Sequence, residues 1–173
     1  HTTARDVARM SIAVFSHSLY YGYSQIWLDE IDHSDGRMTQ LTNTNKLIRL
    51  LDGCDGGKTG STKEAGYCLS ATAKRSGMRL IAVVLGAPSS AERFDAAKEM
   101  LNYGFANYRL YPIAQRGAKV RGELPIIGGE SDRLSLELGG DLTLLIQKGD
   151  EQNVLLTPSL PDMVEAPVEQ GAE

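Results

Sequence analysis

The sequence contains few cysteines: Cys54 and Cys68 are the only two among 173 residues. Two cysteines are too few for the disulfide framework of a small secreted scaffold or for the full ligand set of a structural zinc site. Cys54 lies among turn-forming residues, and Cys68 lies in a run of residues that favours a strand. We therefore expect two unpaired thiols that pack as small apolar side chains.

Histidines are also few, and long apolar runs are missing. The histidines His1, His17 and His33 lie far apart, without the spacing of metal ligands. The sequence therefore predicts no metal site and no cofactor. The best apolar run, residues 80–85, has the length of a single strand, whereas a membrane-spanning helix needs about 20 apolar residues.

Neither sign of charge is in large excess. The chain carries 18 lysines and arginines against 22 acidic residues, a net charge of −4. The basic residues are scattered, so no nucleic-acid partner is expected. With 42% hydrophobic and 23% charged residues, the composition is that of a folded globular protein. The sequence begins with His1 and shows no signal-peptide pattern, so we expect that processing or cloning set its start.

Helix and strand patterns are mixed in the first half of the chain. A capping pair, Thr3 and Asp6, precedes apolar residues at helical spacing, which predicts an amphipathic helix over residues 4 to about 19. Residues 20–45 contain short apolar pieces and turn signals, which indicate short strands and loops. We expect the acidic cluster of this region to lie in a solvated loop and its tyrosines to be partly buried, with a sugar-stacking patch as the alternative. These clusters are Asp29, Glu30 and Asp32, and Tyr20, Tyr21 and Tyr23.

Two further patterns precede residue 110. Residues 65–73 and 78–85 favour strands, and K-R-S-G between them predicts an antiparallel hairpin. Ser89 and Glu92 then have capping-box spacing, which predicts a helix over residues 90–108. The apolar face of this helix consists of Phe94, Ala97, Leu101, Phe105 and Tyr108.

The composition changes after Pro112. Leucines alternate with polar residues in 134–138 and, together with Ile146, in 142–146, which predicts half-buried antiparallel strands. We place a domain boundary near residues 110–115. The predicted fold class is therefore α+β. A first domain, residues 1–110, contains an antiparallel sheet with helices, and a small all-β second domain, residues 111–173, ends as an incomplete β region.

The most informative segment is residues 52–60, D-G-C-D-G-G-K-T-G. A phosphate-binding loop also contains G-K-T, but it needs a glycine where this chain has Asp52. It also needs a helix directly after Lys58 and Thr59. Strand-forming residues follow instead, so we reject the phosphate-loop interpretation.

K-T-G at the start of a strand has a different chemistry. The ammonium of Lys58 and the hydroxyl of Thr59 can hold a carboxylate, one as a point charge and one as a hydrogen-bond donor. Gly60 leaves no side chain to obstruct an extended ligand beside the strand. The segment therefore predicts an anion anchor next to an open strand edge. K-T-G is also the third motif of the penicillin-recognising serine hydrolases, whose other two motifs are S-x-x-K and S-x-N.

The surroundings of K-T-G carry a more specific resemblance. H-T-T-A-R-D at 1–6, N-T-N-K-L at 43–47, D-G-G-K-T-G at 55–60 and E-A-G-Y-C-L at 64–69 resemble, in order and spacing, the low-molecular-mass penicillin-binding proteins. These proteins are serine-type D-Ala-D-Ala carboxypeptidases. Y-G-F at 103–105 and the all-β module after it also fit. The resemblance spans essentially the whole chain and implies part of a β-lactamase-like peptidase domain followed by that family's second domain.

The resemblance also implies a reaction and its residues. In this family a serine attacks the penultimate D-Ala carbonyl, and water then hydrolyses the acyl-enzyme. Lys58 and Thr59 would orient the terminal carboxylate, and the backbone N–H of Ser61 would be one oxyanion-hole donor. Arg93 matches a family arginine near the carboxylate site, with an ordinary solvated arginine as the alternative. Thr44 stands where some relatives have an arginine, a departure from the family pattern at a further carboxylate contact.

The nucleophile is missing from these residues. No serine has lysine three positions later or asparagine two positions later. We therefore expect an internal fragment, inactive alone, that lacks the family's N-terminal segment with both motifs and stops short of its membrane-anchoring helix. The expected partners are a peptidoglycan stem peptide or a β-lactam, and that N-terminal segment as a separate chain. The expected location is outside the cytoplasmic membrane.

Two other interpretations of the sequence stay in view. A non-catalytic module that binds cell-wall peptide or a partner protein would also lack a nucleophile. A β-lactamase relative would share K-T-G, although the all-β module argues against it. An in-frame S-x-x-K and S-x-N upstream of His1 would favour the carboxypeptidase.

Overall fold

A computed structural model describes residues 1–169 and 171. The chain divides into two compact units, one from His1 to Asn107 and one from Tyr108 onward. The boundary region expected at residues 110–115 lies largely inside the first strand of the second unit. In the described part of the chain, no helix is both long and apolar enough to cross a membrane.

The first unit is built on a three-stranded antiparallel sheet in the order β3-β4-β5. The strands are β3 (Cys54–Thr62), β4 (Gly66–Arg75) and β5 (Met78–Ala87). The predicted hairpin is confirmed as β4 and β5, and its turn has Ser76 and Gly77 at φ angles of 47° and 81°. Left-handed backbone at both positions is typical of a tight hairpin turn. Because β4 is central, β3 is an edge strand among the described residues.

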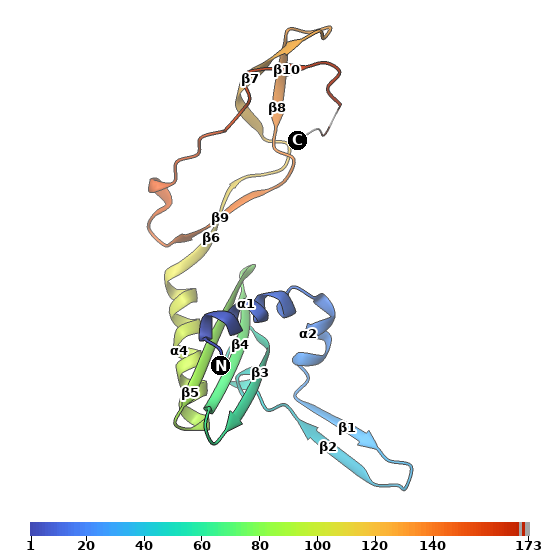
Figure 1. Ribbon diagram of the computed structural model, residues 1–173, viewed down its shortest axis with the longest axis vertical. Helices are drawn as coiled ribbons and strands as arrows, with labels where there is room; N and C mark the ends of the chain where they lie inside the picture. Colours follow the sequence, from blue (N-terminus) through green and yellow to red (C-terminus); the bar gives the residue numbers. More distant parts are fainter. Residues whose placement is uncertain (170, 172–173) are drawn as a thin grey trace. The chain divides into compact units, whose positions relative to one another are not determined.

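Helices cover both faces of this sheet (Figure 1). They are α1 (Ala4–Phe15) and α4 (Ser90–Asn107). Successive side chains of a strand point to opposite faces, so neighbouring residues of β4 contact different helices. The hydroxyls of Ser11 in α1 and Ser70 in β4 lie 2.7 Å apart on one face. On the other face, Leu69 belongs to the core that α4 completes.

Both predicted capping pairs are present at the helix N-termini. Thr3 and Asp6 form a reciprocal capping box at the start of α1. At the start of α4, the Glu92 backbone N–H donates to the Ser89 hydroxyl at 3.2 Å. Each pair satisfies backbone donors that have no partner inside the helix.

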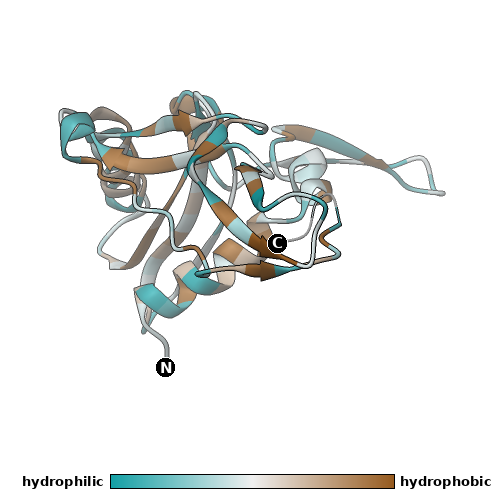
Figure 2. Cartoon of the chain, turned by 90° about the horizontal axis from the view of Figure 1, so that it is seen from above, coloured by the Kyte–Doolittle hydropathy of each residue, from teal (hydrophilic) through white to brown (hydrophobic). Residues whose placement is uncertain are grey.

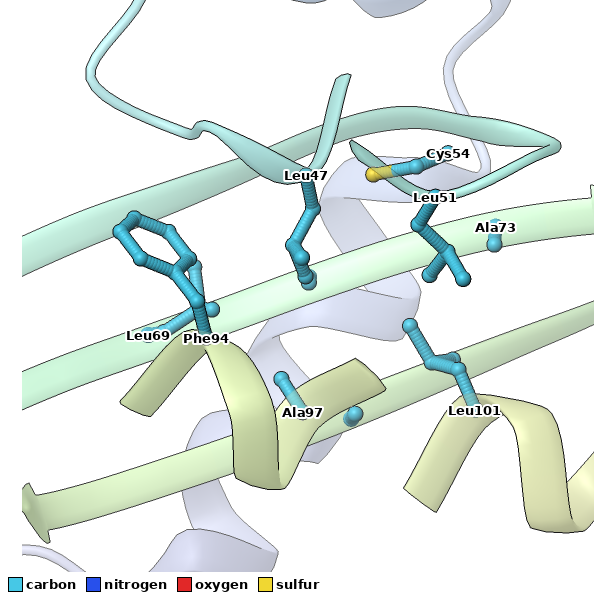
Figure 3. Packing of buried hydrophobic residues seen from close by; sticks show 10 residues of the cluster. Leu47, Leu51, Cys54, Leu69, Ala73, Phe94, Ala97 and Leu101 are labelled. Carbon is cyan, nitrogen blue, oxygen red and sulfur yellow. The ribbon is translucent and has the colours of Figure 1, made fainter. Parts of the chain in front are cut away.

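The core of the first unit lies between α4 and the sheet (Figure 3). Three residues of the predicted apolar face, Phe94, Ala97 and Leu101, are buried there, and Phe105 packs against them partly buried. Tyr108 instead begins the next strand and is 37% exposed. Burial of each large apolar side chain stabilises the fold by about 1.5–3 kcal/mol. The core consists of Leu47, Leu51, Cys54, Leu69, Ala71, Ala73, Ala82, Phe94, Ala97 and Leu101.

The predicted helix over residues 4–19 is wrong at its C-terminal end. α1 ends at Phe15, and a second helix, α2 (Ser18–Ser24), follows a break. The Ser16 hydroxyl donates to the Ala13 carbonyl at 2.7 Å, and His17 adopts an extended conformation. Serine hydroxyls that bond nearby carbonyls compete with helix continuation, which explains the break.

The short strands predicted before residue 45 are present, and they form one regular hairpin. β1 (Leu28–Asp32) pairs antiparallel with β2 (Met38–Thr42), and every residue of both strands is exposed. The predicted acidic loop is therefore wrong, because Asp29, Glu30 and Asp32 lie in β1. The hairpin extends away from the sheet of the first unit in Figures 1 and 2, and Figure 2 shows hydrophobic residues along it.

The K-T-G segment lies in the middle of β3, not at the start of a strand as predicted. Asp52 and Gly53 lie in a turn, as predicted, but residues 54–57 form the first half of the strand. A register shift between Cys54 and Gly56 marks an irregularity there. Gly57 has a φ angle of 139°, and a Cβ on it would lie 2.3 Å from the Ser70 carbonyl oxygen. Gly57 therefore serves a close approach of β3 to β4.

The short helix α3 (Leu47–Leu50) precedes β3, and the second unit contains two small sheets. The second unit's strands β8 and β9 confirm the predicted alternation, with half-buried residues at every second position. They join different sheets, so G-G-D between them is a connection, not a hairpin turn. β6 (Tyr108–Ala114) pairs with β9 (Leu142–Gln147), and β7 (Lys119–Ile127) pairs with β8 (Arg133–Glu137) and with β10 (Val164–Glu165).

Both cysteines are free, as predicted, and their environments differ. Cys54 is buried with 8% of its surface exposed, and burial raises the pKa of its thiol. Cys68 is partly exposed.

Because accessible thiolates attack disulfide reagents, we predict fast reaction of Cys68 and slow reaction of Cys54 with DTNB near neutral pH. Absorbance traces will show two phases, and Cys68→Ser will remove the fast one. A single phase for both thiols would contradict the difference in burial.

The burial of Cys54 also predicts a pH dependence of stability. A thiol with a raised folded pKa keeps its proton in the folded state after the unfolded chain has lost it. Its contribution to the free energy of unfolding is complete below the unfolded pKa, about 8.5. The contribution is lost as the pH rises through the raised folded pKa. Urea unfolding between roughly pH 8 and 10 should show a smaller loss of stability for Cys54→Ala than for the unsubstituted chain.

Candidate functional site

The free edge of β3 is the centre of the candidate site. Over residues 57–62 the strand pairs with β4 in unbroken register. In an antiparallel pair, residues that bond the neighbouring strand alternate with residues whose N–H and C=O point away from it. The Gly57 N–H donates to the Tyr20 hydroxyl at 3.0 Å, and that hydroxyl donates to the Gly57 carbonyl at 3.2 Å. Both groups of Gly57 therefore point away from β4, and the alternation puts those of Thr59 and Ser61 on the same edge.

Lys58 carries its charge to this edge. Its side chain is exposed, and its ammonium donates to the Thr59 backbone carbonyl. That carbonyl is one of the groups on the free side of β3, so the ammonium lies beside the strand and not out in bulk water. The chain after Lys58 continues as a strand instead of a helix, which agrees with the rejection of a phosphate loop.

Thr59 points to the opposite face of β3 from Lys58, because the two residues are neighbours in a strand. Its side chain is 9% exposed, and its hydroxyl donates to the Thr44 hydroxyl at 2.8 Å. Thr44 is exposed. A hydroxyl that accepts one hydrogen bond keeps its own proton for another acceptor, so the pair can donate onward through Thr44. Thr44, which stands where some relatives have an arginine, is thus in direct contact with the K-T-G threonine.

Arg93 is a buried side chain, which excludes the alternative of an ordinary solvated arginine. It is 8% exposed, and one of its terminal nitrogens donates to the Gly60 and Cys68 carbonyls at 3.2 and 3.3 Å. Its guanidinium carbon lies 5.5 Å from the ring centroid of Tyr67 and 4.8 Å from that of Phe94. The Nε atom of Arg93 has no hydrogen-bond partner among the described residues. Arg93 therefore fixes the K-T-G glycine from the α4 side of the sheet.

Gly60 and Ser61 leave the edge open after Lys58 and Thr59. A Cβ placed on Gly60 would have no atom of the described chain within 4 Å. Ser61 is exposed and pairs across the strands with Tyr67. The position of Gly60 therefore opens onto free space beside the strand.

An apolar groove of about 530 Å³ borders the K-T-G segment on the α1 side. In α1, Ser11 and Phe15 are buried, while Met10 and Val14 are 58% and 46% exposed. These two exposed side chains line the groove together with Leu85 of β5. The groove therefore joins a charged strand edge to unpaired apolar surface.

A salt bridge that the sequence does not predict holds the start of β3. Arg79 of β5 bonds both carboxylate oxygens of Asp55 at 2.8 Å, across the central strand. The same guanidinium donates to the Thr72 hydroxyl at 2.9 Å and lies 4.1 Å from the ring centroid of Tyr21. The bond to Asp55 raises the pKa of Arg79, and burial raises the pKa of Tyr21. Nothing in the spacing of these residues identifies the contact, because it depends on the order of the strands.

The tyrosines of α2 divide between the strand and the solvent. Tyr20 and Tyr21 are partly buried, as predicted, and Tyr23 is 70% exposed. The Tyr20 hydroxyl contacts the edge of β3, a role that the sequence does not indicate. The sequence predicts only that Tyr20 is partly buried. A partly buried phenol can still place its hydroxyl against the backbone edge of a strand, so the predicted burial does not reveal this contact.

Comparisons with known proteins identify the family. A family model described as D-alanyl-D-alanine carboxypeptidase, peptidase family S11, matches residues 1–89. D-alanyl-D-alanine carboxypeptidase DacF of Bacillus subtilis is 32% identical over 174 residues, which cover 100% of this chain and 44% of DacF. DacA of Escherichia coli is 38% identical over 154 residues, covering 86% of this chain and 36% of DacA. The chain belongs to the D-Ala-D-Ala carboxypeptidase family of low-molecular-mass penicillin-binding proteins.

A solved structure supports the fold class. Penicillin-binding protein 5 of Haemophilus influenzae superposes with a TM-score of 0.76 at 28% identity, over 99% of this chain and 49% of that protein. The predicted α+β class, part of a penicillin-binding carboxypeptidase with a β module after it, is therefore confirmed. The chain spans less than half the length of these relatives.

The Asp55–Arg79 bridge predicts a stability effect. Both side chains are about one quarter exposed, at 23% and 25%. Asp55→Asn removes a charge-assisted bidentate contact and should lower the free energy of unfolding by about 2 kcal/mol. Asp35→Asn is the control, because Asp35 and its partner Arg37 are 53% and 76% exposed, and solvent screening should make its effect much smaller than that of Asp55→Asn. Equal midpoints of urea unfolding for the two variants would show that the bridge does not hold β3.

Proposed function

We propose that these residues form the carboxylate-binding side of a serine-type D-Ala-D-Ala carboxypeptidase that acts on peptidoglycan stem peptides and is acylated by β-lactams. The observation that carries the proposal is the free edge of β3, with the Lys58 ammonium beside it and the Ser61 N–H on the same side. Family membership supplies the reaction class. Since the family acts on the cell wall, the enzyme works outside the cytoplasmic membrane.

In this mechanism the peptide lies antiparallel to β3. The Lys58 ammonium leaves the Thr59 carbonyl and holds the terminal D-Ala carboxylate, while the Thr44–Thr59 hydroxyl pair donates a further hydrogen bond. The scissile carbonyl, one residue earlier in the peptide, faces Ser61. The Ser61 N–H stabilises the negative charge that develops on the oxygen of the scissile carbonyl. In acyl-transfer enzymes one such donor stabilises the transition state by about 2.7–4 kcal/mol. Arg93 holds the Gly60 carbonyl, and its expected place near the carboxylate site stays part of the proposal.

The serine nucleophile and its lysine base come from a segment outside these 173 residues. No serine of the sequence is followed by lysine at the required distance. We place that segment against the apolar groove beside K-T-G, because the groove leaves apolar side chains exposed next to Lys58. Binding of that segment, in the same polypeptide or as a separate chain, would complete the site.

The 173-residue chain alone should therefore not be acylated. We predict no covalent label after incubation with a fluorescent penicillin and separation on a denaturing gel. The complete protein, or the chain mixed with a segment carrying S-x-x-K and S-x-N, should be labelled. A label on the isolated chain would overturn the claim that the nucleophile lies elsewhere.

The anchor role of Lys58 gives a second test, in the complete protein. Lys58→Ala should lower the second-order rate of penicillin acylation on the order of 100-fold, because it removes one charged partner of the ligand carboxylate. Lys63→Ala is the matched control: it removes the same charge five positions later, in the turn after β3. Stopped-flow acylation kinetics measure both. Equal acylation rates for the two variants would show that Lys58 does not bind the ligand carboxylate.

A non-catalytic module that binds cell-wall peptide or a partner protein is the second candidate. The observation in its favour is the missing nucleophile in these residues. The gene sequence upstream of His1 distinguishes the two candidate functions. In-frame S-x-x-K and S-x-N motifs would indicate the carboxypeptidase, and their absence would indicate the binding module.

A further inference from the structure

The first half of the β3 edge is closed by side chains from outside the sheet. The three successive carbonyls of residues 55–57 accept hydrogen bonds from such side chains. Their donors are the Ser24 hydroxyl at 2.6 Å, the Asn45 amide at 3.0 Å and the Tyr20 hydroxyl at 3.2 Å, in this order. The Tyr20 hydroxyl also accepts from the Gly57 N–H at 3.0 Å, so both backbone groups of this residue are bonded. An extended ligand therefore finds open backbone groups only beyond Gly57.

The phenol at Gly57 is held in place by its surroundings. Its ring packs against Phe15, with ring centroids 5.1 Å apart. A Cβ on Gly56 would lie 2.8 Å from a ring carbon of Tyr20, so ring and strand are in close contact. The single proton of the hydroxyl is used on the Gly57 carbonyl. Beside Gly57, a ligand carboxylate would therefore meet the ring and an oxygen without a free proton.

The proposed function fixes one register for the peptide on this edge. The penultimate D-Ala faces Ser61, and the terminal carboxylate lies two strand positions away, beside Thr59. The nearest alternative is a shift by two residues, because a shift by one turns every side chain to the opposite face. A shift toward the start of β3 puts the carboxylate beside Gly57, still next to Lys58, but takes the scissile carbonyl away from the Ser61 N–H. The shifted complex is therefore nonproductive, and a shift the other way takes the carboxylate away from Lys58.

We propose that Tyr20 holds the peptide in its productive register by closing Gly57 to the terminal carboxylate. The inference rests on the proposed function, which fixes the direction of the peptide and its contact with Ser61. The shifted complex has to break both hydrogen bonds of the phenol or bury the carboxylate against it without a donor. Without the hydroxyl, the Gly57 N–H becomes a free donor beside Lys58, and a carboxylate accepts from it through a charge-assisted bond. Tyr20 is thus a positioning residue that acts through the edge of β3.

Steady-state kinetics of the complete enzyme with an acyl-D-Ala-D-Ala peptide test this role. Tyr20→Phe removes the hydroxyl and keeps the ring that packs against Phe15. A shifted complex that binds substrate without reacting lowers kcat and KM by the same factor. It leaves kcat/KM unchanged, because kcat/KM compares the transition state with free enzyme and free substrate. We expect kcat and KM each to fall about threefold, since the freed N–H gives the shifted complex a new hydrogen bond to a charged group.

Two variants control for the loss of a hydroxyl and for a looser α2. Tyr21→Phe removes a phenol hydroxyl that donates to the Phe15 carbonyl, and it leaves Gly57 closed. Ser24→Ala removes a bond between α2 and β3, but it frees only the Asp55 carbonyl, an acceptor that a carboxylate cannot use. Both variants should keep the kcat and KM of the unsubstituted enzyme. Titration with penicillin counts the folded active sites, so partial unfolding of a variant does not imitate a lower kcat.

The outcomes separate the inference from the proposed function. A purely structural role of Tyr20 would lower kcat/KM in Tyr20→Phe and also in Ser24→Ala. That pattern, or a kcat and KM that Tyr20→Phe leaves unchanged, would overturn the inference while the carboxypeptidase proposal stands. If the unsubstituted enzyme neither cleaves the peptide nor is acylated by penicillin, the proposed function itself is wrong.

Discussion

The site depends on the backbone hydrogen bonds of one strand that has no neighbour on one side. An edge strand presents unpaired N–H and C=O groups, and proteins manage such edges by covering them or by using them. β3 shows both solutions within a few residues. The Tyr20 hydroxyl covers Gly57, and the Lys58 ammonium covers the Thr59 carbonyl. The edge beyond Lys58 is then the part that an extended ligand can complete.

Two arginines hold this edge strand from opposite faces of the sheet. Arg79 bonds Asp55 on the face covered by α1, three residues before Lys58. Arg93 bonds the Gly60 carbonyl on the face covered by α4, two residues after Lys58. The segment that carries the anchor is therefore fixed on either side by charge-assisted contacts. Such fixed geometry lowers the ordering cost of binding, because little freedom is left to lose.

The sequence predicts elements whose signals are local. Capping pairs, the β4–β5 hairpin and the apolar face of α4 all depend on residues a few positions apart, and all are present. The glycine-rich start of β3 was predicted as a turn, but Gly57 serves a close approach to β4 and Gly56 a close approach to α2. The Asp55–Arg79 bridge was also not predicted, because it joins the two outer strands of the sheet across the central strand. Contacts of this kind follow from strand order, and a single sequence does not contain strand order.

The candidate site was predictable to a different degree for each residue. K-T-G identifies Lys58 as the charge, but its side-chain position follows from the edge carbonyl that holds it. That bond keeps the ammonium at the edge, so in the proposed mechanism binding exchanges a neutral carbonyl for a carboxylate. The bond from the ammonium to the carbonyl is already charge-assisted, and a carboxylate acceptor adds the attraction of a full opposite charge. In the proposed mechanism this exchange favours the anion without any large movement of the lysine, because the ammonium already lies beside the strand edge.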